Sequence, residues 1–82
     1  MKYSEKIERA KNPNTSPKVL ALLAQDQDAN VRCNVARNTS TPAEALALLA
    51  RDKDEDVREA AKENKSYIMR NIYTLFNQAM NR

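Results

Sequence analysis

Acidic residues gather at two places in the 82-residue chain, in the segments DQD (26–28) and DKDED (52–56). Paired carboxylates can act as general acid and base, and a carboxylate cluster can bind a calcium ion. The second segment lacks the central glycine and the distal glutamate of a calcium loop. The simpler interpretation is that Asp28 and Asp54 cap helices, because an aspartate accepts hydrogen bonds from the free N–H groups of a first turn.

Other reactive residues are scarce. The chain has no histidine, no glycine and a single cysteine, Cys33. A Ser–His or Cys–His pair, a glycine-rich phosphate loop and an internal disulfide are therefore excluded, and zinc, haem and iron–sulfur sites lack their usual ligands. We expect no enzymatic activity, no metal and no cofactor. Cys33 is expected to be a partly exposed surface residue, with a reactive thiol as the alternative.

Charge is distributed unevenly along the chain. Residues 1–63 carry eleven basic and eleven acidic residues, so the net charge of +3 comes from Lys65, Arg70 and Arg82. The N-terminus has no apolar run of the kind found in signal peptides, and no stretch approaches 18 apolar residues. A lone thiol without an export signal fits the cytoplasm, where we expect the protein to act.

The elements that position these residues repeat with a period of 26. Residues 12–37 and 38–63 align without gaps and agree at eleven positions, and Asn64 begins a third period. Each period predicts two short helices that are too short to be stable alone and must stack on their neighbours. We expect one domain over residues 1–82: an N-terminal helix in 1–11, repeats at 12–37 and 38–63, and a C-terminal helix in 64–82.

The first helix of each repeat is expected to begin at a capping residue. In the second repeat Thr41 is the predicted N-cap, with Pro42 at the first helical position and Glu44 completing a capping box. In the first repeat Thr15 or Ser16 caps the helix. The apolar run that follows (19–24) predicts an inner helix that is buried nearly all round.

The second helix of each repeat is expected to begin at Asp28 or Asp54. Three asparagines, Asn12, Asn38 and Asn64, each follow a predicted helix. Helices commonly end on a glycine in the left-handed conformation, and asparagine is the next-best residue for it. We therefore expect these asparagines to end the helices.

The two ends depart from the repeat. Residues 4–11 predict the second helix of a preceding half-repeat. Residues 66–81 predict one longer amphipathic helix, capped by Ser66. Its apolar stripe is expected to cover the exposed face of the last repeat, as a solenoid cap does. The stripe consists of Ile68, Ile72, Leu75, Phe76 and Ala79.

The segment NPNTSPKVLALLAQDQDANVRCNVARN resembles the leucine-rich repeat variant, a bacterial repeat similar to HEAT-like repeats. The resemblance covers residues 12–64. It implies an all-α, right-handed solenoid of paired short helices, one of which can be 3₁₀ rather than α, and a role as an interaction scaffold. Some members of that family bind a 4Fe–4S cluster through N-terminal cysteines, but residues 1–32 contain no cysteine, so this property does not carry over.

Arg32 and Arg58 lie one period apart and admit two interpretations. They form Arg–Asp pairs that fix repeat against repeat, or they form a basic row that meets an acidic partner. The second interpretation gives the set expected to bind a protein partner: Arg32, Cys33, Arg37, Arg58, Glu59, Lys62, Lys65 and Arg70.

Two alternatives to protein binding remain open. A nucleic-acid binder would use the basic residues Arg32, Arg37, Arg58, Lys62, Lys65 and Arg70, although Glu59 and Glu63 interrupt that track. A structural subunit would instead form a homodimer through the last helix, since two repeats are fewer than a solenoid normally needs. Its self-association residues would be Tyr67, Met69, Tyr73, Phe76 and Met80.

Overall fold

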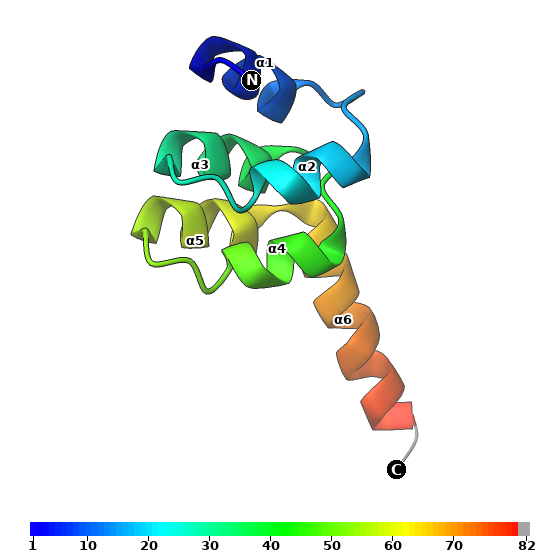
Figure 1. The fold of residues 1–82 in the computed structure, drawn as a ribbon. Coiled ribbons are helices and arrows are strands. Elements are labelled where there is room, and N and C mark those ends of the chain that lie inside the picture. The colour runs from blue at the N-terminus through cyan, green and yellow to red at the C-terminus, as the bar shows by residue number, and fades with distance from the viewer. Residues whose placement is uncertain (81–82) are drawn as a thin grey trace.

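The computed structural model describes residues 1–80, apart from the side chain of Tyr73, and this part of the chain contains six α-helices and no strand (Figure 1). The all-α prediction is confirmed, as are the five short helices followed by a longer one. None of the six is a 3₁₀-helix. The helices are α1 (Tyr3–Lys11), α2 (Pro17–Leu23), α3 (Ala29–Arg37), α4 (Ala43–Leu49), α5 (Glu55–Glu63) and α6 (Lys65–Met80).

The first five helices form two layers. The second helices α1, α3 and α5 stack in one layer, and the first helices α2 and α4 lie beside them, while α6 projects from the end of the stack (Figure 1). This arrangement is that of a short helical-repeat solenoid. Its right-handed sense, which the resemblance implies, stays a prediction.

The core is built from the same positions of both repeats. Leu20 and Leu46 are fully buried, and Leu23 and Leu49 are each 2% exposed. Val31, Val35 and Val57, from the second helices, belong to the same core cluster as these leucines. The period in the sequence is therefore a period in the core.

The first helices are not buried all round, so that expectation was wrong. Leu22 is 64% exposed and Leu48 is 68% exposed, although each lies between buried leucines of its run. A seven-residue helix makes only two turns, and its core-facing side is already filled by positions 20 and 23, or 46 and 49. The remaining leucine of each helix, Leu22 or Leu48, therefore lies on the outer side.

The predicted aspartate caps are confirmed. The carboxylate of Asp28 accepts hydrogen bonds from the N–H groups of Asn30 and Val31, and Asp54 does the same at α5. Ser16 caps α2, with Pro17 at the first helical position. Capping by Thr41 was wrong: α4 begins after Pro42, which has no side-chain cap.

The two threonines instead close the preceding helices. The hydroxyl of Thr41 donates to the carbonyl oxygen of Val35, and that of Thr15 donates to Arg9, both at 2.7 Å. Carbonyl groups of a last helical turn lack partners within the helix. Threonine at this position supplies one, which explains why both repeats retain it.

The three asparagines do end helices, but not in the left-handed conformation. Their φ angles are −77° at Asn12, −76° at Asn38 and −69° at Asn64, and no residue of the described chain has positive φ. The side chains explain this choice. Nδ2 of Asn38 donates to the carbonyl oxygens of Ala10 and Asn12, at 2.8 and 2.9 Å.

Asn64 repeats this arrangement one period later. Its Nδ2 donates to the carbonyl oxygens of Ala36 and Asn38, at 2.8 and 2.9 Å. Each amide thus reaches back to the previous asparagine, and we call this series (Asn12, Asn38, Asn64) the asparagine ladder. Asn38 and Asn64 are almost fully buried, so the ladder joins the repeats from within.

The last helix does not cover the end of the solenoid, which corrects the prediction of a capping helix. It begins directly after Asn64, without the loop that precedes α2 and α4. Ser66 is therefore inside the helix and not its cap; its hydroxyl donates to the carbonyl oxygen of Thr39. The beginning of α6 contacts α4 and α5, but the predicted stripe of Ile68, Ile72, Leu75 and Phe76 is exposed.

Candidate interaction surfaces

Arg32 is the first candidate residue, and the structure places it inside the molecule. Its side chain is 6% exposed and forms a two-pronged ion pair with Asp52 of the next repeat. Nε donates to Oδ2 at 2.8 Å, and Nη2 donates to Oδ1 at 3.1 Å. Nη1 also donates to the carbonyl oxygens of Asp26 and Gln27. Arg32 therefore fixes repeat against repeat through Asp52, and each of its three side-chain nitrogen atoms donates a hydrogen bond.

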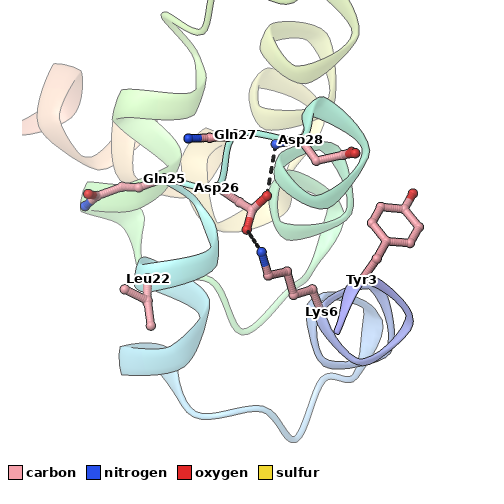
Figure 2. Close-up of a pocket in the computed structure, with 7 residues that line it drawn as sticks. All are labelled: Tyr3, Lys6, Leu22, Gln25, Asp26, Gln27 and Asp28. Carbon is pink, nitrogen blue, oxygen red and sulfur yellow. Dashed lines mark hydrogen bonds and ion pairs between the residues drawn. The ribbon is translucent and has the colours of Figure 1, made fainter. Parts of the chain in front are cut away.

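An equivalent ion pair lies one period earlier. Nζ of Lys6 lies 2.8 Å from Oδ2 of Asp26, the residue that corresponds to Asp52 (Figure 2). Lys6 and Arg32 are 26 residues apart, and so are the two aspartates. We call these pairs, Lys6–Asp26 and Arg32–Asp52, the rungs. The spacing of Lys6 was visible in the sequence, but its pairing was missed because α1 resembles the repeats so little.

The rungs change the acidity of both aspartates. Hydrogen bonds from Lys6 and from the backbone N–H of Asp28 lower the pKa of Asp26 below its ordinary value. Burial raises the pKa of Asp52, but hydrogen bonds from Arg32 and from the N–H of Asp54 outweigh it, so that this pKa is also lowered. Both aspartates are therefore held as carboxylates.

The other charged residues of the predicted set differ in exposure and in their partners. Arg58 is half-buried, and its Nη1 donates to the carbonyl oxygen of Asp52. Arg70 pairs with Glu44 on the exposed side of α4, at 2.8 Å. Four others are exposed on α5 or near helix ends: Arg37, Glu59, Lys62 and Lys65.

Cys33 is a half-buried residue of α3, and its side chain faces α5. Its Sγ is 4.0 Å from the carbonyl oxygen of Asp56, at the edge of a hollow of about 230 Å³. The partial exposure predicted from the sequence is confirmed. Among residues 1–80, no group of three or more metal-ligating side chains is found.

A surface that the sequence analysis missed runs along the first helices. Hollows lie where successive helices meet: about 750 Å³ between α1 and α2, 320 Å³ between α2 and α4, and 390 Å³ between α4 and α6. Leu22 lines the first of them, and Leu48 lines the other two. We call this side, with Leu22, Leu48 and the three hollows, the first-helix face.

The hollows differ in chemistry. The first is lined by Lys6, Asp26 and Asp28 as well as by Leu22, and the rung crosses the space between α1 and the loop after α2 (Figure 2). The second is mainly apolar, with alanines from α2 and α4 beside Leu48. The third adds an aromatic ring from Tyr67. The face therefore offers apolar contacts beside charged groups along its length.

The sequence did carry a signal for this face. The apolar run of each first helix contains three leucines, at positions 20, 22 and 23 and again at 46, 48 and 49. On a helix, positions 20 and 23 share a side that position 22 does not. Burial of all three would require neighbours on every side, which two layers of helices do not provide.

The asparagine ladder and the rungs each recur after 26 residues, and together they define a 26-residue structural repeat. Residues 29–54 match the leucine rich repeat variant model. The match spans one full period of this repeat, from the start of α3 through α4 to Asp54. The resemblance inferred from the sequence is confirmed over these residues. No curated protein and no solved structure matches the chain.

The leucine rich repeat variant is a helical repeat, and its match here contains Arg32, Asn38 and Asp52. These three residues join one repeat to the next, so what the match records is a structural unit. No helix of the described chain is long and apolar enough to cross a membrane.

Proposed function

We propose that this protein is a non-enzymatic interaction module that binds a segment of another protein along the first-helix face. The observation that supports this is the pair of exposed leucines, Leu22 and Leu48, at equivalent positions of adjacent repeats. Isolated exposed leucines are common, but a periodic row beside hollows is the form of a solenoid's binding surface.

The spacing of the repeats describes the expected partner. The helices α3 and α5 of successive repeats pack against each other, and packed helices lie about 8–10 Å apart, so equivalent residues such as Leu22 and Leu48 recur at about that interval. A polyproline II segment places residues i and i+3 on one side about 9 Å apart, and an α-helix places residues i and i+7 on one side about 10 Å apart. The partner is therefore a protein segment with apolar side chains at one of these spacings.

The charges around the face favour protein over nucleic acid. Four carboxylates line the hollows and three of them are paired with a cation, so the face has no continuous basic track for phosphate groups. Arg32, the centre of the predicted basic row, is buried in its rung. The carboxylates are Asp26 and Asp28 in the first hollow, and Glu44 and Asp52 in the second.

The test is selection of binding peptides from a displayed peptide library, followed by substitution of the face. The double variant Leu22→Ser/Leu48→Ser should lose at least tenfold in affinity for the selected peptides. Both leucines are largely exposed, so the helical circular dichroism signal should stay unchanged.

A matched variant distinguishes this face from the last helix. Leu75→Ser changes an equally exposed leucine on α6 and should leave peptide binding intact. Loss of binding in Leu75→Ser, with full binding in the double variant, would overturn the assignment. Retention on heparin that falls steeply with salt, without peptide binding, would favour nucleic acid instead.

A further inference from the structure

The helix α6 carries the largest apolar surface on the molecule as described. Six large apolar side chains on it are 40–68% exposed. We call them the apolar face of α6: Ile68, Met69, Ile72, Leu75, Phe76 and Met80. Of the residues predicted for self-association, Met69, Phe76 and Met80 belong to this face, whereas Tyr67 packs against the core and the side chain of Tyr73 is outside the described part.

This face points away from the body of the protein. Tyr67, Arg70 and Asn71 line the hollow shared with α4, and Arg70 pairs there with Glu44. With 3.6 residues per turn, these positions lie on the opposite side of the helix from Ile68 and Ile72. No part of residues 1–80 therefore covers the apolar face.

We propose that a second copy of this chain covers it, with the two α6 helices packed antiparallel around a two-fold axis. Six side chains of about 200 Å² each, exposed as above, offer roughly 700 Å² per copy, close to the ~800 Å² per partner of a standard interface. Apolar patches of this size are rare on monomers and mark interaction sites. A two-fold interface uses one patch twice, so the same face serves both copies.

The charges on α6 favour the antiparallel orientation. Lys65 is three residues before Ile68 and seven before Ile72, so it lies at the N-terminal end of the same face. No acidic residue occurs between positions 65 and 80. Parallel helices would bring the two lysines together, whereas antiparallel helices place each lysine beside the C-terminal end of the other helix, where a cation is stabilised.

The shape of the molecule permits this arrangement. The last helix projects from the end of the solenoid, and its distal turns have no neighbour within the described chain (Figure 1). Two such helices lying antiparallel hold the two solenoids at opposite ends of the pair. The solenoids then do not collide, and the first-helix faces stay accessible.

The first test is the mass in solution, measured by sedimentation equilibrium over a range of protein concentration. The expected result is a mass that rises from that of a 9.3 kDa chain to twice that value. Ile72→Asp should remain a single chain, because a charge would be buried at the centre of the pair. Thr74→Asp places the same charge on the polar side of α6 and should still dimerise.

The second test fixes the orientation by disulfide trapping in a Cys33→Ser background. An equimolar mixture of Lys65→Cys and Ala79→Cys chains should form a mixed disulfide on oxidation, whereas Lys65→Cys alone should not. A single-chain mass at every concentration would overturn the proposal, as would a dimer that persists in Ile72→Asp. A self-linked Lys65→Cys, or a monomer whose α6 binds anionic lipid vesicles instead, would do the same.

Discussion

Asp52 balances a cation that water scarcely reaches. The side chains of Arg32 and Asp52 are 6% and 10% exposed, and their geometry is that of a two-pronged ion pair. We predict that Asp52→Ala lowers the free energy of unfolding by about 2–4 kcal/mol, because Arg32 would remain buried without its partner. Urea unfolding followed by circular dichroism measures this.

Another pair in the same protein supplies the control. Arg70 and Glu44 are equally close, at 2.8 Å, but their side chains are 53% and 76% exposed. Glu44→Ala should therefore leave the unfolding midpoint nearly unchanged, since exposed pairs contribute little. Equal losses in the two variants would show that burial is not what gives Arg32–Asp52 its strength.

The lowered pKa values of Asp26 and Asp52 predict a loss of stability in acid. Both groups have an ordinary pKa of 3.8, and both are lowered in the folded protein. Their contribution is thus complete above about pH 4 and is lost as the pH falls through the folded values, because the unfolded chain binds protons first. Urea unfolding at pH 7 and pH 3 measures the difference. In Asp52→Asn, whose side chain cannot titrate, the free energies of unfolding at pH 7 and pH 3 should differ less than in the unaltered protein.

At the scale of the helices, the asparagine ladder provides the sharpest comparison. Nδ2 of Asn38 satisfies two carbonyl groups of the preceding repeat, and this side chain is buried. We predict that Asn38→Ala costs about 1–3 kcal/mol, since it leaves the buried carbonyl group of Ala10 without its donor, whereas that of Asn12 keeps the N–H of Thr15. Thermal unfolding of the two variants Asn38→Ala and Asn12→Ala measures the contrast.

Asn12 is the matched control because it is the first residue of the asparagine ladder. Its side chain is exposed and only accepts a hydrogen bond from the N–H of Asn14. Asn12→Ala should therefore lose much less stability than Asn38→Ala. A loss of the same size at both positions would mean that ending a helix, and not the ladder, explains these asparagines.

The helices themselves were predictable, because their signals are local. Asp28, Asp54 and Ser16 cap helices by bonding N–H groups two or three residues away, and propensity and spacing reveal such contacts. Asn38 ends a helix as predicted, but the left-handed conformation predicted for it was wrong. Its decisive partners lie 26 and 28 residues earlier, and no local pattern records them.

The same limit applies to exposure. The pattern of α6 predicted an amphipathic helix but not what would lie against its apolar side, because that depends on the direction the chain takes after Asn64. The middle leucine of each apolar run, Leu22 or Leu48, was likewise predicted to be buried, only because the whole run is apolar. The period predicts which residues are equivalent, whereas the two-layer arrangement leaves the outer side of both first helices uncovered.

At the scale of the whole molecule, the stack has a centre. The helix α3 lies between α1 and α5, whereas those two have a neighbour in the layer on one side only. We predict that amide hydrogen exchange is slowest in α3, around the buried Val31 and Val35, and faster in α1 and α5. Nuclear magnetic resonance resolves this residue by residue. Stronger protection of α1 than of α3 would contradict it.

Arg58 ends a series that Lys6 and Arg32 begin. Residue 78, where a third aspartate would stand, is glutamine, and among residues 1–80 no carboxylate lies within ion-pair distance of Arg58. Suppose that a second copy of residues 12–37 were inserted after position 37. The aspartate of the copy would pair with Arg32, and the arginine of the copy would pair with the existing Asp52. Gene duplication can therefore lengthen this protein without creating a new kind of contact between repeats, since every added repeat contains both the basic and the acidic partner of the ion pair.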